Sequence, residues 1–157
     1  MNRTGMFLSV LTPVALFLAA VPVPATALNQ VMYVPTPIQV PCSMGMDRVR
    51  AGIRAGLLRR SWLPTDTRAG SMDATLDKKG KYKVVVEIVY DEKHVQIGYK
   101  SSEGMQYDPT GTEYSSSRAN PLVKTPTDGK PTIKPGYNSW VRNIEKDISV
   151  ELSRTCG

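Results

Sequence analysis

The sequence predicts an α+β fold in which a three-stranded antiparallel meander is covered by two helices, in the order α-β-β-β-α. Three observations predict this two-layer sandwich. Apolar residues recur at helical spacing in residues 43–60 and again from residue 135 onward. Between these segments, three runs alternate apolar and polar residues and are separated by two short turns. A length of 157 residues suits a single domain, which we expect to span residues 43–156.

The first 27 residues have the pattern of a secretory signal peptide. Arg3 supplies the positive charge, residues 6–21 are apolar and uncharged, and Ala25-Thr26-Ala27 is a small-x-small cleavage pattern. A transmembrane anchor fits less well, because Pro13 interrupts the apolar run and no basic cluster follows it. We therefore expect cleavage near Ala27 and an exported protein that is periplasmic or secreted and soluble.

Residues 28–42 are expected to form an extended arm, because three prolines push the residues before them into extended geometry. Cys42 follows Gln39-Val40-Pro41 rather than a small residue near the apolar run, so lipidation at Cys42 is not expected. The chain has two cysteines, Cys42 and Cys156. In an oxidising compartment two such cysteines usually pair, and we predict a disulfide between them.

A helix is predicted over residues 43–60, with Ser43 as its N-cap. Its apolar residues fall on one stripe: Met46, Val49, Ile53 and Leu57. Gly52 and Gly56 flank this stripe, and the cost of glycine inside a helix predicts that another element packs closely there. Five arginines lie on both sides of the stripe: Arg48, Arg50, Arg54, Arg59 and Arg60.

Three strands are predicted next, centred on residues 72–76, 82–90 and 95–99 and joined by turns short enough for hairpins. Residues 108–132 are rich in Pro, Gly, Ser and Thr and carry few large apolar groups, so they are predicted to be a mobile insertion. The last helix is predicted to begin at Pro135 or Gly136. If the two helices lie antiparallel on one face of the sheet, the two cysteines meet.

Several segments of this framework have a familiar pattern. Arg60-Ser61-Trp62 follows the first helix, the run from Val84 to Tyr90 ends in Asp91, and Tyr137-Asn138-Ser139-Trp140-Val141-Arg142-Asn143 opens the last helix. Together they resemble a family of small, functionally uncharacterised bacterial envelope proteins, many of which look like lipoproteins. The resemblance covers roughly residues 44–152 and implies a helix–three-strand–helix envelope domain. The chain departs from the family pattern in lacking a lipobox and in carrying the insertion at residues 108–132.

Composition excludes several kinds of chemistry. One His and two Cys are too few for Cys-rich zinc sites, iron–sulfur clusters or multi-His metal centres, and we expect neither a metal nor a cofactor. Loss of Arg3 on cleavage lowers the formal charge from +6 to +5. That charge would attract anionic envelope polymers or lipid headgroups. Nucleic acid is not an expected partner, because the arginines straddle the core stripe and export removes the usual target.

The lone histidine, His94, lies beside Asp91 and Glu92 and could act as a general base, although a solvated hairpin histidine fits better. No catalytic motif occurs in the chain. The sequence thus predicts a non-enzymatic exported domain that binds another envelope component and favours a protein as that component. Candidate interaction residues are Arg48, Arg50, Arg54, Arg59 and His94. The alternatives are a periplasmic enzyme with a site near His94, and an inhibitor or chaperone-like module that uses the 108–132 loop.

Overall fold

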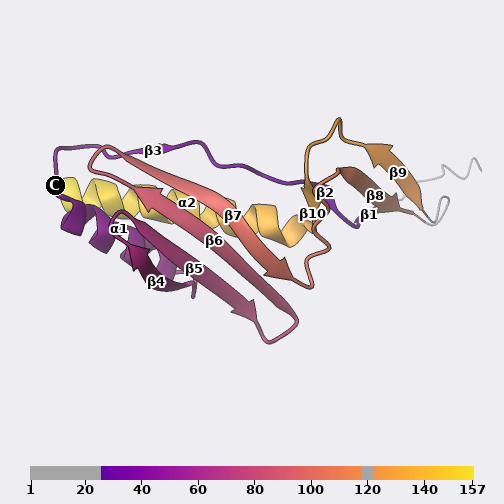
Figure 1. Ribbon diagram of the computed structural model, residues 1–157, viewed down its shortest axis with the longest axis horizontal. Helices are drawn as coiled ribbons and strands as arrows, with labels where there is room; N and C mark the ends of the chain where they lie inside the picture. The colour runs from indigo at the N-terminus through magenta and orange to yellow at the C-terminus, as the bar shows by residue number, and fades with distance from the viewer. Residues whose placement is uncertain (1–25, 118–121) are drawn as a thin grey trace, which may run out of the picture.

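The computed structural model describes residues 26–117 and 122–157, and within them it forms two helices and three β-sheets. Helices α1 (Met46–Leu58) and α2 (Pro135–Cys156) lie on one face of a five-stranded antiparallel sheet, the main sheet (Figure 1). Its strand order is β3-β7-β6-β5-β4. The strands are β3 (Ile38–Gln39), β4 (Leu63–Arg68), β5 (Ser71–Lys78), β6 (Tyr82–Tyr90) and β7 (His94–Glu103).

The prediction of a three-stranded meander covered by two helices is wrong, because the described residues form three sheets and the main one has five strands. Strands β5, β6 and β7 form the expected meander, but β4 and β3 extend it on its two sides. Strand β4 gave no apolar alternation because it is an edge strand that is exposed along most of its length. Strand β3 has only two residues and comes from the segment that was expected to be a separate arm. Strands β3 and β4 form because their backbones pair with β7 and β5, and the local sequence does not reveal such pairing.

The core lies between the main sheet and the helices. Alternate residues of β5, β6 and β7 are buried on the face toward the helices, as the alternation predicts. The opposite face is more polar, although it includes Val85 and Val89, and carries ion pairs such as that between Lys100 and Asp73 with a nitrogen–oxygen distance of 2.7 Å. An antiparallel sheet with one packed and one solvated face commonly has this pattern. The buried apolar residues of the meander are Met72, Ala74, Leu76, Val84, Val86, Ile88, Val95 and Ile97.

The two helices pack antiparallel and very closely. A Cβ atom added at Gly56 would lie 2.7 Å from the backbone nitrogen of Ile148, and one at Gly52 would lie 3.0 Å from a methyl group of Leu152. The predicted close approach at these glycines is therefore confirmed. Helix α2 begins at Pro135, as predicted, but α1 begins at Met46 with Gly45 as its N-cap, so the prediction of Ser43 as the cap is wrong.

The predicted disulfide between Cys42 and Cys156 is present, with 5.8 Å between the Cα atoms. It links the residues that precede α1 to the last residue of α2 and so fastens the two helices where they meet. The bridge is consistent with the antiparallel arrangement that the sequence predicted. Neither helix of the described residues is long and apolar enough to cross a membrane.

Residues 28–42 run extended along α2 and are held there by specific contacts. Strand β2 (Gln30–Val31) pairs with β10 (Thr132–Ile133), forming a two-stranded sheet. The buried side chain of Asn138 accepts a hydrogen bond from the Tyr33 backbone N–H at 2.8 Å and donates one to the Val31 carbonyl at 2.8 Å. The Tyr33 hydroxyl also donates to Glu145 at 2.7 Å. The arm is thus part of the folded body.

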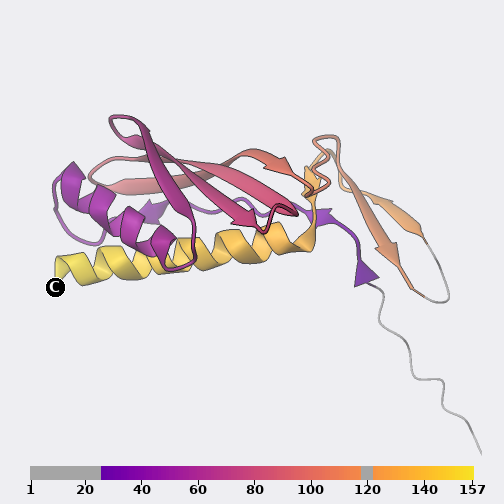
Figure 2. The ribbon, with the colours of Figure 1, turned by 90° about the horizontal axis from the view of Figure 1, so that it is seen from below.

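Part of the predicted insertion at residues 108–132 forms strands. Strands β8 (Thr112–Ser116) and β9 (Val123–Pro126) pair antiparallel, and β1 (Thr26–Ala27) completes a three-stranded small sheet in the order β1-β8-β9. Figures 1 and 2 show the small sheet projecting beyond the start of α2. Mobility of this segment stays a prediction. The predicted signal peptide lies outside the described residues, except for the two residues of β1.

Candidate functional site

The arginines proposed from sequence as interaction residues bind partners within the chain. Arg50 makes two hydrogen bonds to the Asp66 carboxylate of β4, and Arg54 lies 3.3 Å from the same group. Arg59 lies 3.2 Å from the Glu151 carboxylate of α2. Arg48 donates a hydrogen bond to the backbone carbonyl of Thr155, near the disulfide. These contacts tie α1 to its two neighbours, and a role of the same arginines in binding a partner stays a prediction.

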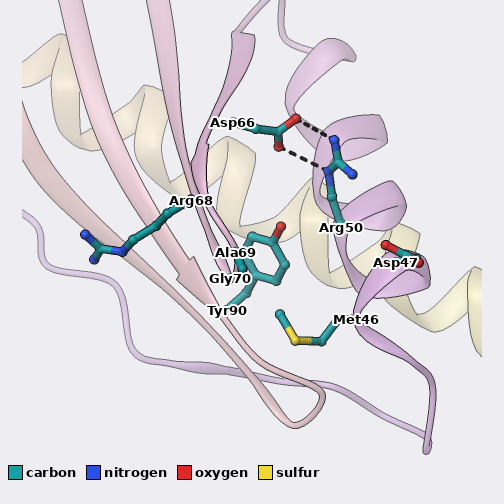
Figure 3. Close-up of a pocket in the computed structure, with 8 residues that line it drawn as sticks. All are labelled: Met46, Asp47, Arg50, Asp66, Arg68, Ala69, Gly70 and Tyr90. Atoms are coloured by element: carbon teal, nitrogen blue, oxygen red, sulfur yellow. Dashed lines mark hydrogen bonds and ion pairs between the residues drawn. The ribbon is translucent and has the colours of Figure 1, made fainter.

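A hollow of about 390 Å³ lies beside this network, between α1, β4 and the end of β6. In Figure 3, Arg50 and Asp66 face each other near the ring of Tyr90, while Arg68 points away. Arg50 holds the pKa of Asp66 below its usual range through their hydrogen bonds, and burial raises the pKa of Tyr90. Because Arg50 and Asp66 neutralise each other, the hollow offers little charge to a ligand. The hollow is lined by Met46, Asp47, Arg50, Asp66, Arg68, Ala69, Gly70 and Tyr90.

His94 lies at the start of β7 and is about half exposed, with Nδ1 3.6 Å from Asp91. Asp91 is occupied by the turn, since its Oδ1 accepts hydrogen bonds from the backbone N–H groups of Lys93 and His94 at 2.7 Å each. Those bonds lower the pKa of Asp91. The serines of β7 are at the far end of the strand, at positions 101 and 102. The structure therefore brings no serine of that strand to His94.

Four lysines and two aromatic rings gather at the opposite end of the main sheet, and sequence reasoning missed this group. We call it the lysine–aromatic patch; it consists of Lys78, Lys79, Lys81, Tyr82, Lys134 and Trp140. The turn between β5 and β6 contributes the first three lysines, and α2 with the residue before it contributes Lys134 and Trp140. The signal in the sequence was Lys78-Lys79-Gly80-Lys81, which was interpreted only as a turn.

A second hollow, of about 400 Å³, lies where the small sheet joins the body. We call it the tyrosine hollow; it is lined by Leu28, Asn29, Gln106, Tyr107, Asp108 and Tyr114. Asn29 shapes it, donating to the Thr112 carbonyl at 2.8 Å and accepting from the backbone N–H of Tyr114. Tyr107 stacks on Tyr99 with ring centroids 4.4 Å apart, which fixes one wall.

Comparisons with protein-family models, with curated proteins and with solved structures found no match for this chain. Within residues 26–117 and 122–157, no three His, Cys, Asp or Glu side chains gather as a metal site would need. The lysine–aromatic patch and the tyrosine hollow are two surfaces that the geometry offers as candidates for binding.

Proposed function

We propose that this chain is an exported, non-enzymatic domain that binds another protein of the cell envelope. The observation that carries the proposal is the tyrosine hollow at the base of the projecting small sheet. Tyrosine is enriched at protein interfaces, because its ring buries a large area while its hydroxyl keeps a hydrogen-bond partner. Two lining residues are well exposed, Leu28 at 41% and Tyr107 at 37%.

The small sheet adds a second means of binding. Strand β9 is exposed at every residue and stands at the edge of the sheet, with β8 as its neighbour. An exposed edge carries unpaired backbone groups that an extended peptide can pair with, while pockets for side chains provide specificity. We propose that the partner is an envelope protein that supplies an extended segment to pair with β9 and an apolar side chain to fill the tyrosine hollow.

Three observations support the export that this proposal requires. The N-terminal residues have the signal-peptide pattern, and the chain resembles small envelope proteins over roughly residues 44–152. The Cys42–Cys156 disulfide is of the kind that persists in oxidising compartments such as the periplasm. Mass measurement of the protein recovered from the periplasm tests export, and we expect a chain that begins near Leu28, in which β1 (Thr26–Ala27) is removed and β8 and β9 remain as a hairpin. Recovery only from the cytoplasm with residues 1–27 attached would contradict it.

The binding test captures envelope proteins with purified wild-type protein and with Tyr107→Ala and Tyr114→Ala. If the tyrosine hollow binds the partner, the wild type should capture a protein that mass spectrometry identifies, and both variants should fail to capture it. Val89→Ala is the matched control, because Val89 is similarly exposed at 45% but belongs to β6 of the main sheet. A set of captured proteins that does not change among all four would refute binding at this hollow.

A further inference from the structure

The lysine–aromatic patch joins residues that are far apart in the sequence. The ammonium group of Lys134 lies 4.9 Å from the ring centroid of Tyr82, and that of Lys81 lies 5.2 Å from the same centroid. Lys78 lies 5.9 Å from the ring of Trp140, and the Tyr82 and Trp140 centroids are 6.3 Å apart. The fold therefore places several positive charges around two neighbouring rings on one surface.

The charge of the patch is not cancelled by nearby carboxylates. Among the described residues, Lys78, Lys79, Lys81 and Lys134 take part in none of the ion pairs, unlike the arginines of α1. Of the two acidic residues beside them, Asp77 keeps its negative charge within the same turn and Glu103 pairs with Lys83, so the lysines stay in excess. Asp77 accepts a hydrogen bond from the Gly80 backbone N–H at 2.7 Å, and Glu103 lies 3.6 Å from Lys83.

A positive potential at the patch also affects its tyrosine. The pKa of Tyr82 is lowered, chiefly because Lys81 stabilises the phenolate by a hydrogen bond and Lys134 adds its charge. Lys81 and Lys134 thus make the surface around Tyr82 positive, while Lys78 lies over the neighbouring ring of Trp140, and this spread of charge favours anionic groups there. Lys78, Lys81 and Lys134 lie at the rings, and Lys79 adds a fourth positive charge in the same turn; a group of at least four basic residues is the pattern associated with anionic lipid surfaces.

The aromatic rings and their apolar neighbours indicate what kind of anion fits. A hollow of about 170 Å³ lies between the rings, bounded by Leu28, Met105 and Gly136 among others. Gly136 lets the indole of Trp140 lie against the start of α2, because a Cβ there would be 3.1 Å from the ring. Tryptophan, tyrosine and lysine are the residues that settle at the boundary between lipid headgroups and water.

We propose that the lysine–aromatic patch binds anionic phospholipid headgroups at a membrane surface of the envelope. The lysines contact headgroup phosphates, while Trp140 and Tyr82 lie at the headgroup level. A lipid surface fits better than one bound phosphate, since the ammonium groups are spread over an open surface instead of converging in a buried pocket. This inference rests on the proposed function and names a second envelope component.

The test measures binding of the disulfide-bonded protein to vesicles of phosphatidylglycerol and phosphatidylcholine in equal parts. Binding should be absent on pure phosphatidylcholine and should weaken as salt is added. Neutralising one lysine should lower the partition coefficient about fivefold, which corresponds to about 1 kcal/mol for each basic side chain near an anionic surface. The double variant Lys81→Gln/Lys134→Gln should therefore lose about 25-fold. Emission of half-buried Trp140 should move to shorter wavelength, while Trp62, at 1% exposure, stays constant.

The control double variant Lys93→Gln/Lys146→Gln removes the same charge far from the patch, at the other end of the β6–β7 hairpin and along α2. It should bind vesicles nearly as the wild type does. Equal losses in the two double variants would overturn the proposal, because net charge alone would then explain binding. So would equal binding to pure phosphatidylcholine, or binding to soluble polyphosphate without binding to vesicles. Protein capture through the tyrosine hollow is measured without vesicles, so either proposal can fail alone.

Discussion

The side chain of Asn138 forms hydrogen bonds to two backbone groups of the arm, as a neighbouring strand would. Its amide accepts from the Tyr33 N–H and donates to the Val31 carbonyl, which satisfies two backbone groups of the arm. Asn138→Ala leaves both groups without that partner, and we expect a loss of about 1–3 kcal/mol in the free energy of unfolding. Denaturant titration measures the loss, and hydrogen exchange should show faster exchange at the Tyr33 amide. Asn143→Ala, at an exposed position of the same helix, should change neither.

We expect Tyr137 to lower the free energy of unfolding at alkaline pH. The residue is 1% exposed, and burial raises the pKa of its hydroxyl far above the ordinary value of about 10. The unfolded chain therefore ionises first, so this part of the stability is complete below about pH 10 and is lost as the pH rises further. Unfolding measured against pH should show a loss that is reduced in Tyr137→Phe. Parallel curves for the two proteins would mean that Tyr137 does not cause the alkaline loss.

At the scale of elements, the contact between the helices depends on Gly56. Alanine there would gain about 1 kcal/mol in helix propensity, but its Cβ would lie 2.7 Å from the backbone of Ile148. Shifting the backbone of α2 to relieve this clash costs free energy, so we expect Gly56→Ala to lower the free energy of unfolding by about 1–3 kcal/mol. Gly52→Ala meets only the end of a leucine side chain, so it should cost clearly less. Thermal unfolding of both variants checks this order.

The elements that sequence patterns predicted are those whose patterns reflect their own burial. Strand β6 alternates over its full length, and Pro135 marks the first turn of α2, where proline suits the helix. Strand β4 was missed because the Thr65–Arg68 stretch faces solvent and is ordered by pairing with β5. The ion pair between Arg50 of α1 and Asp66 of β4 could not be predicted either, because no local sequence pattern reveals it.

The lysine–aromatic patch could not be predicted for a related reason. Lys81 and Lys134 belong to different elements, and only the packing of α2 against the meander brings both to the ring of Tyr82. Local sequence reports on secondary structure through periodicity, whereas a binding surface depends on which distant residues share one face. The ion pairs of the candidate arginines could not be predicted either, since their partners Asp66 and Glu151 lie in other elements.

The whole molecule divides into a packed body and a projecting small sheet, and the boundary falls inside the segment 108–132. Its inner part belongs to the body. Thr132 is fully buried and accepts a hydrogen bond from Asn29 at 3.0 Å, and Asp108 forms a bridge with Thr132. Its outer part contacts mainly itself and β1, and every residue of β9 is exposed.

This division predicts different outcomes for two deletions. Replacing residues 115–124 with a short Gly/Ser turn should barely change the denaturation midpoint, because a twofold change in loop length alters closure by only about 0.6 kcal/mol. Replacing the whole of 108–132 should cost well over about 1 kcal/mol, because Asn29 loses its buried partners and β2 loses β10. Denaturant titration compares the two variants with the wild type. If the short replacement is as damaging as the long one, the small sheet is part of the core and cannot serve as an independent projecting surface for a partner.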